Sequence, residues 1–367
     1  MRRAPARLLV VLAVLLACVA LGGPASAHVG GAVAGSDFDG RVVSVTPEIP
    51  GVRVRILQFG DELELVNRTG SEISVPGYSD EPYLRIGPDG VWRNAHSPAT
   101  YINLDRYGHV ALPDSASPAA EPEWVQVSTE PHYIWHDHRT HWMSQRILPP
   151  QVAAAPDRSH TVFEWTVPMR HGDDPVEVAG VLTWSPPPSP WLIWPVYGAL
   201  ALAGLAAGLL ARTARPLGAL MPAAAAAALW HALATPEPPV SVGSHTGALV
   251  SALLPAGLAV LVAGLGFWAS RRGRGAMTGL LAVVLGWLVL VQGLPDVDAL
   301  WTAHVLAVGP QPVARAAVAV LVALGAGLVA GGIAAVRRLR ETDAPGDDEA
   351  DRLLPVGSAV SRPPPQG

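Results

Sequence analysis

Residues 190–211 carry the stretch that decides the fold, PWLIWPVYGALALAGLAAGLLA, in which no residue is charged. A helix needs about 20 predominantly apolar residues to cross the hydrocarbon core of a bilayer. The whole chain is 50% apolar and only 15% charged, which is too apolar for an ordinary soluble domain. We therefore predict an α-helical transmembrane bundle over residues 189–338. Its five spans are expected at about residues 191–211, 217–234, 246–269, 277–294 and 313–336.

Arginine clusters indicate how these spans are oriented. Arg212 and Arg215 follow the first span, residues 271, 272 and 274 separate the third from the fourth, and residues 337, 338 and 340 follow the fifth. All three clusters lie on one side of the membrane, as the positive-inside rule requires, if the N-terminal domain is outside. The sequence thus predicts a multi-pass plasma-membrane protein with an extracytoplasmic N-terminal domain and a cytoplasmic C-terminus.

The first 27 residues have the order of a signal peptide. Arg2 and Arg3 form a charged start, an apolar run follows at residues 8–21, and residues 25–27, Ala-Ser-Ala, have the small side chains of a cleavage site. Cleavage there would make His28 the first residue and would remove the only cysteine, Cys18. A rival interpretation makes Cys18 a lipidation site. The predicted organisation is a signal peptide at 1–27, an outer domain at 28–188, the bundle at 189–338 and a disordered cytoplasmic tail at 339–367.

The outer domain has the patterning of β-structure. Apolar and polar residues alternate over several short runs, which Gly, Pro, Asn and Asp bound. The clearest runs are residues 52–56, 62–65, 161–167 and 176–182. Six to nine short strands in this length predict an all-β sandwich of the cupredoxin or immunoglobulin kind. The Pro- and Gly-rich stretch 76–118 is expected to form ordered loops. We expect four tryptophans in the core, Trp124, Trp135, Trp165 and Trp184.

Residues 132–143, HYIWHDHRTHWM, hold four histidines within ten residues. If residues 133–138 form a strand, the first three histidines share one face, and a turn at residues 139–140 can return a further ligand. Imidazole binds copper, zinc, nickel and iron, and a nearby thioether favours copper. The alternative is a structural loop whose histidines bond to backbone and water. The predicted ligands are His132, His136, His138, His141, Met143 and Asp137, with copper as the ion and zinc as the alternative.

Two further features extend this prediction. His28, as a mature N-terminus, would offer its α-amine and Nδ1 together, as in a copper-binding histidine brace. Ionisable residues also gather at the outer ends of the spans, where such groups commonly line a site or a pathway. The apolar run 299–308 is too short to span and predicts an interfacial or re-entrant half-helix that presents His304. The predicted second site comprises His231, His245, Asp296, Asp298 and His304; the alternative is snorkelling to the headgroups.

These features together resemble a known architecture. A cleaved signal, an N-terminal histidine, a β-sandwich and a bundle with outer histidines resemble the fused copper-resistance C and D proteins of actinobacteria, and more broadly actinobacterial membrane proteins with a cupredoxin-like exterior. Residues 136–143 are also similar to the copper-ligand strings of multicopper oxidases. They lack the cysteine of those strings, which excludes a blue-copper site in the cleaved chain.

The sequence therefore predicts a membrane-anchored extracytoplasmic protein that handles copper for uptake, delivery or tolerance. Its expected partners are the lipid bilayer, a metal ion and other copper-handling membrane or periplasmic proteins. A net charge of −5 without a basic block argues against nucleic acid. The first alternative is a cell-surface binding or assembly module with a structural histidine cluster. The second is a copper-dependent oxidase that uses His28.

Overall fold

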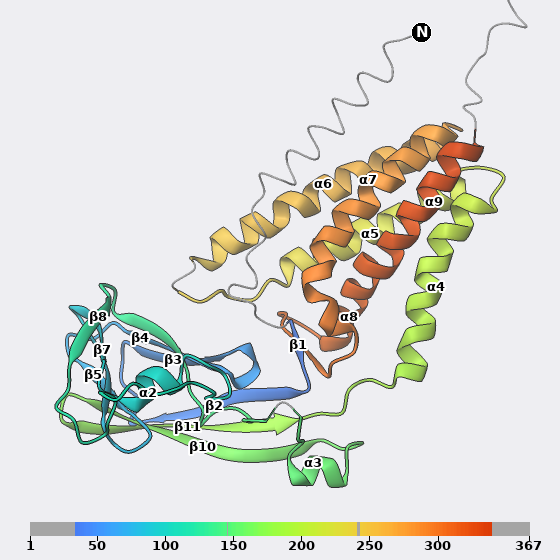
Figure 1. The fold of residues 1–367 in the computed structure, drawn as a ribbon. Coiled ribbons are helices and arrows are strands. Elements are labelled where there is room, and N and C mark those ends of the chain that lie inside the picture. The colour runs from blue at the N-terminus through green and yellow to red at the C-terminus, as the bar shows by residue number, and fades with distance from the viewer. Residues whose placement is uncertain (1–33, 145, 241–242, 340–367) are drawn as a thin grey trace, which may run out of the picture.

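The computed structural model describes residues 34–144, 146–240 and 243–339. The predicted signal peptide, His28 and nearly all of the predicted tail lie outside these residues. The described chain forms a β-rich part, which we call the β domain (residues 34–188), followed by a helical bundle (Figure 1). The coarse prediction of a β-rich N-terminal part before membrane-length helices is confirmed.

Two sheets make up most of the β domain. The larger has the strand order β2-β11-β10-β5-β6-β7-β8, and the smaller has the order β3-β4-β9. The strands are β2 (Phe38–Thr46), β3 (Val52–Leu57), β4 (Glu62–Asn67), β5 (Ile73–Pro76), β6 (Pro82–Gly87), β7 (Gly90–Asn94), β8 (Trp124–Ser128), β9 (His132–His136), β10 (His160–His171) and β11 (Asp174–Trp184). Short turns of helix are η1 (Gln58–Gly60), α2 (Pro98–Ile102) and α3 (Pro150–Ala154).

The long β10–β11 hairpin shows why the sequence pattern gives this fold. Buried Trp165, Val167 and Met169 alternate with exposed residues along β10, and β11 repeats the pattern from Val176 to Trp184. Successive side chains of a strand point to opposite faces, so alternation buries one face only. Apolar residues of both sheets, among them Leu63 of β4, join one core. The two sheets therefore stabilise each other by burying a shared apolar surface.

Two expectations for the β domain need correction. The stretch 76–118 is not only loop, because it contains β6, β7 and α2. Trp135, Trp165 and Trp184 are buried as predicted. Trp124 is only half-buried, since it lies on the edge strand β8, where the Arg85 guanidinium covers its ring at 5.1 Å.

Within the described chain, five helices are long and apolar enough to cross a membrane, as predicted. Two of them include irregular turns: the 3₁₀ segment η2 extends α7, and the π-helical segment η3 joins α8 to α9. The elements are α4 (Pro190–Leu209), α5 (Arg215–Leu233), α6 (His245–Arg271), α7 (Gly275–Gly293), η2 (Leu294–Leu300), α8 (Gln311–Ala319), η3 (Val320–Leu324) and α9 (Gly325–Arg338).

The run 299–308 is not the predicted half-helix. It contains the end of η2 and the short strand β12 (His304–Val305), which pairs with β1 (Gly35–Ser36). The Arg315 guanidinium donates hydrogen bonds to the carbonyls of Ala299, Thr302 and Ala303. These bonds satisfy backbone acceptors where the helical turn ends, so the chain can leave the helix and form a strand.

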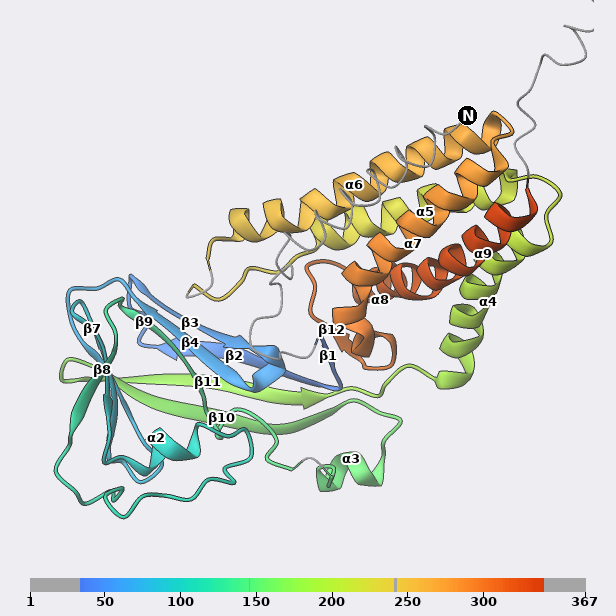
Figure 2. The same ribbon diagram turned by 45° about the horizontal axis from the view of Figure 1, so that its top comes forward.

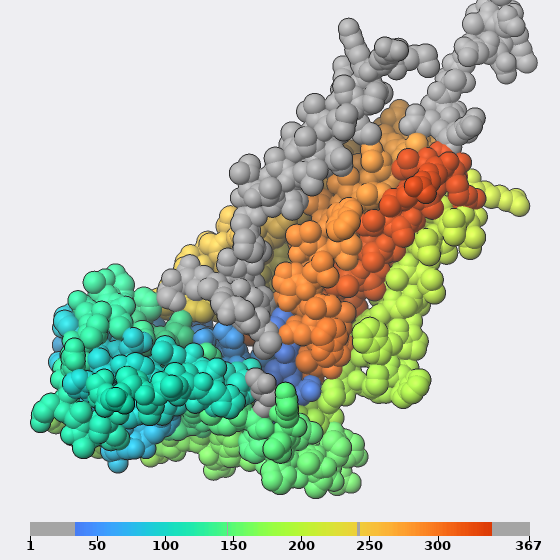
Figure 3. Space-filling model, viewed as in Figure 1, coloured from blue at the N-terminus to red at the C-terminus, as the bar shows by residue number. Residues whose placement is uncertain are grey.

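The β domain docks on one end of the bundle, which we call the junction end. Figures 1 and 2 place β1 at this end, close to α8, and Figure 3 shows β1 in blue between the domain and the helices. The pairing of β1 with β12 is one connection between the two parts, and Glu64 makes another. Glu64 is fully buried and accepts hydrogen bonds from Arg55 Nε and the backbone N of Val240, each at 2.7 Å. A buried carboxylate needs such partners, so Glu64 fixes the α5–α6 segment against β3 and β4.

Candidate metal centre

Strand β9 ends at His136, earlier than the predicted strand. His132 and His136 lie opposite Val66 and Glu62 of β4, so they share a face. Four residues of strand separate them by about 13 Å, which is too far for one metal ion. His138 lies beyond the strand, in a turn that starts at Asp137. The structure thus separates His132 from the other histidines of the cluster.

Asp137 fixes the shape of this turn. Its carboxylate is fully buried and accepts hydrogen bonds from Arg139 Nε at 2.7 Å, Arg139 Nη2 at 2.6 Å and Trp135 Nε1 at 2.9 Å. The Arg139 guanidinium also lies over the Tyr78 ring, 5.2 Å from the ring centroid. Both carboxylate oxygens are engaged in a bidentate pair, which positions the loop. Asp137 therefore braces the site, whereas the sequence predicted it as a ligand.

The predicted turn does return His141 to the cluster. Thr140 Oγ1 donates a hydrogen bond to the carbonyl of Gly60 at 2.6 Å, which ties the turn to η1. The His141 ring is then buried and meets the His138 ring edge to face, with the centroids 5.5 Å apart. Met143 lies farther along and is 37% exposed. Two imidazoles are thus in direct contact at the centre of the predicted cluster.

Each of three imidazoles has one ring nitrogen tied to a backbone carbonyl. His136 Nδ1 lies 3.0 Å from the carbonyl oxygen of Asp61, His138 Nε2 lies 2.9 Å from that of Asp105, and His141 Nδ1 lies 3.2 Å from that of Trp142. A carbonyl only accepts, so the ring nitrogen must carry the proton, and the opposite nitrogen of each neutral ring keeps its lone pair. Metal-binding histidines are oriented in this way.

The free nitrogens have unequal surroundings. His141 Nε2 is buried and has no hydrogen-bond partner among the described residues. His136 Nε2 lies 3.9 Å from Glu62 Oε1. Burial lowers the pKa of the His141 imidazole to about 4 and also lowers that of His138. His141 therefore stays neutral at pH 7, which is the form that binds a metal.

Acidic and basic residues from other segments complete the surroundings. Asp61 is buried and pairs with Arg106 Nη2 at 2.7 Å. Burial raises the pKa of the Asp61 carboxyl to about 6 and raises that of Glu62. Among residues 34–144, 146–240 and 243–339, no group of three or more His, Cys, Asp or Glu side chains is arranged to hold a metal ion. What the described chain offers is a pair of touching imidazoles with a third nearby.

The structure divides the predicted second site into separate contacts. His231 Nε2 lies 3.0 Å from Asp296 Oδ2, while His245 Nε2 lies 3.2 Å from the carbonyl oxygen of Thr235. Asp298 Oδ2 accepts a hydrogen bond from the backbone N of Ala34 at 3.0 Å. His304 lies on β12. These side chains all lie at the junction end, but the contacts just described are separate ones, with the β domain or with the end of a helix, and do not form one shared site.

Sequence reasoning missed the residues that orient the imidazoles. Asp61 and Asp105 act through backbone carbonyls, whose positions no side-chain pattern reveals. Tyr78 accepts a hydrogen bond from the backbone N of His138 at 3.0 Å, from 60 residues away. The alternation in residues 62–65 correctly predicted that Glu62 lies on a strand. Its position opposite His136 is known only from the register between β4 and β9.

Comparison with protein-family models, with curated proteins and with solved structures found no match to the chain. The function must therefore be inferred from this chain's own side chains.

Proposed function

We propose that this chain is a membrane-anchored extracytoplasmic protein that binds copper through His138 and His141, with His136 as a third ligand. The observation that carries the proposal is the carbonyl bond to one nitrogen of each ring, which leaves the other nitrogen with a lone pair. The proposed role is uptake, delivery or tolerance of copper, as expected from the architectural resemblance to the copper-resistance proteins.

The small number of ligands favours copper over zinc. Structural zinc sites almost always have four ligands, and both oxygens of Asp137 are already engaged. Copper(I) accepts two or three ligands, and imidazole suits it. The unpartnered Nε2 of His141 would gain a bond on binding, which offsets its burial without a hydrogen bond. A shift of the two rings would let both free nitrogens meet one ion.

The proposed topology places the β domain outside the cell membrane. Figure 1 shows the α4–α5 turn, the α6–α7 turn and the end of α9 at the end of the bundle opposite the β domain. The arginine clusters follow or precede these elements in the sequence, so the positive-inside rule assigns that end to the cytoplasm. A reporter active only in the cytoplasm should be active when fused after Arg338 and silent when fused after Pro239. The reverse pattern would contradict this orientation.

Copper(I) affinity of the full chain in detergent tests the proposed site, with a chromophoric chelator as the competitor. We expect His138→Ala and His141→Phe each to weaken binding at least about tenfold. Phe keeps a buried ring at position 141, so loss of affinity is separated from loss of packing. His160→Ala is the matched control, because His160 Nε2 also lies near a carbonyl, that of Ala155 at 2.7 Å. His160 stands outside the cluster and should not affect affinity.

The second candidate is a surface module in which the histidines are structural. The observation that favours it is the same set of carbonyl bonds, since these hold the turn without any ion. The two proposals differ in one measurement. If the variant with both His138→Ala and His141→Phe binds copper as tightly as the parent, the structural role replaces metal binding.

A further inference from the structure

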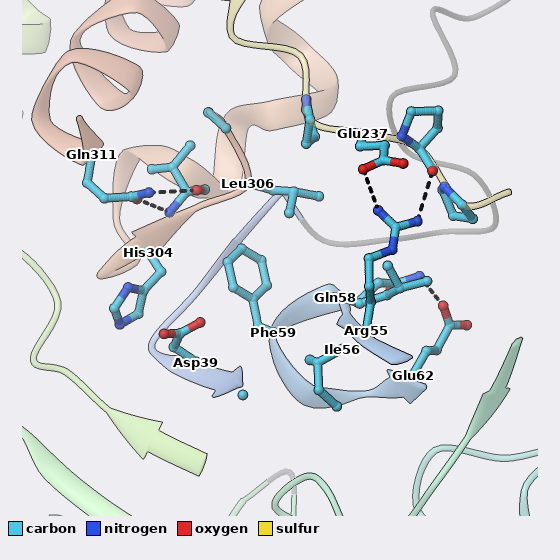
Figure 4. Close-up of a pocket in the computed structure, with 17 residues that line it drawn as sticks. Asp39, Arg55, Ile56, Gln58, Phe59, Glu62, Glu237, His304, Leu306 and Gln311 are labelled. Carbon is cyan, nitrogen blue, oxygen red and sulfur yellow. Dashed lines mark hydrogen bonds and ion pairs between the residues drawn. The ribbon is translucent and has the colours of Figure 1, made fainter. Parts of the chain in front are cut away.

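A cavity of about 550 Å³ lies at the junction between the β domain and the bundle. One wall comes from β2, β3 and η1, another from prolines at 236, 238 and 239, and a third from the segment 304–311 (Figure 4). Small-molecule sites commonly have volumes of about 300–1,000 Å³ and form between domains. A bare metal ion needs far less space, so this volume favours an organic ligand.

The charges that line the cavity leave it acidic. Among the described lining residues, the basic side chains are Arg55 and His304. Arg55 pairs with Glu64 at 2.7 Å through Nε and with Glu237 at 3.3 Å. Glu237 also pairs with Arg53 at 2.9 Å, so these four side chains neutralise one another.

Two carboxylates that line the cavity, those of Asp39 and Glu62, do not belong to this neutral group of four side chains. Asp39 pairs with the largely exposed Arg41 at 3.3 Å, and solvent screens such an ion pair strongly. Glu62 accepts a hydrogen bond from the neutral Gln58 at 3.1 Å and lies 3.9 Å from His136 Nε2. A cationic ligand therefore fits the cavity better than an anionic one.

The other walls suit an apolar body beside that charge. Figure 4 shows the Phe59 ring between Asp39 and Leu306. An ammonium close to an aromatic face and a carboxylate gains both cation–π and Coulomb attraction. Gln58 and Phe59 adopt φ values of 50° and 61°, which non-glycine residues seldom do. Such strained backbone is frequent at ligand clamps, and here it directs Phe59 into the cavity.

We propose that the junction cavity binds an organic primary ammonium group, with Asp39 and Phe59 as the main contacts and Glu62 supplying further negative potential. This site is distinct from the copper site proposed at the histidine cluster, although Glu62 lies 3.9 Å from His136 Nε2. Because the cavity lies at the end of the membrane helices, the ammonium has two sources: a free amine from the aqueous side, or the ethanolamine headgroup of a lipid.

The test is calorimetric binding of phenethylamine to the full chain in nanodiscs of phosphatidylcholine. We expect saturable binding that Asp39→Asn and Phe59→Leu each weaken at least about tenfold. Phenylacetate, which has a similar body and the opposite charge, should not bind. Glu48→Gln removes an exposed carboxylate outside the cavity and should leave the affinity unchanged.

A second preparation in phosphatidylethanolamine nanodiscs separates the two sources. If the headgroup is the natural occupant, phenethylamine should bind more weakly there; if a free amine is, the affinity should be the same in both lipids. Two results would overturn the proposal. One is phenethylamine binding that Asp39→Asn and Phe59→Leu leave intact. The other is no phenethylamine binding in phosphatidylcholine, where no ethanolamine headgroup competes.

Discussion

The contact between α7 and α9 depends on glycines, and adding one methyl group tests it. An ideal Cβ on Gly286 would lie 2.6 Å from the carbonyl oxygen of Gly325 and 2.7 Å from Val329 Cγ2. An ordinary contact is about 3.4 Å, so Gly286→Ala must move the helices apart by about 0.8 Å or distort them. Overpacking of this kind costs about 1–3 kcal/mol. Small residues at such crossings let membrane helices approach closely.

Gly264 provides the matched control, since it also lies within a membrane-length helix, α6, but a Cβ there meets nothing within 4 Å. Gly264→Ala should stabilise its helix by about 0.5–1 kcal/mol through the lower backbone entropy of alanine in the unfolded chain. Thermal unfolding of the full chain in detergent, followed by tryptophan fluorescence, should give a Tm several degrees lower for Gly286→Ala than for Gly264→Ala. Equal melting temperatures would refute the close α7–α9 contact.

Three further predictions concern the β domain, each checked by thermal unfolding of the full chain. Glu64→Ala should lower the free energy of unfolding by about 3 kcal/mol because it leaves buried partners without their carboxylate. Arg41→Ala breaks a surface pair with Asp39 and should cost less than about 1 kcal/mol. The pKa of His141 is lowered to about 4, so its contribution to stability is present above about pH 6.5 and is lost as the pH falls towards 4; His141→Phe should flatten that decline. The pKa of Asp61 is raised to about 6, which gives the opposite sign: stability is lost as the pH rises from about 4 to 6, and Asp61→Asn should make the loss on acidification steeper.

The architecture was largely predictable because its signals are local. Helices that cross a membrane need long apolar runs, and the five predicted spans agree with five described helices. Alternation likewise gave β10 and β11, whose inward residues are buried from Trp165 to Trp184. The prediction was wrong for residues 299–308, where apolar composition indicated a helix. Residues 304–305 form a strand because β12 pairs with β1, about 270 residues away. The local sequence does not indicate a partner so distant in the chain.

The candidate site was predictable only in part. The histidine spacing suggested a common cluster, but a strand that ends at His136 separates His132 from it. Asp137 was predicted as a ligand because carboxylates bind metals. Both of its carboxylate oxygens instead accept hydrogen bonds from the neighbouring Arg139 guanidinium. The tautomer-fixing carbonyls come from other segments, so they depend on the tertiary fold.

Strand β4 connects the histidine cluster to the bundle. Leu63 and Leu65 point into the core of the β domain, so Glu62 and Glu64 must point to the opposite face. On that face Glu62 lies beside His136 and lines the junction cavity, while Glu64 holds the α5–α6 segment through Val240. One strand face therefore lies beside the proposed copper ligand His136, lines the proposed ammonium cavity and holds the segment that joins α5 to α6.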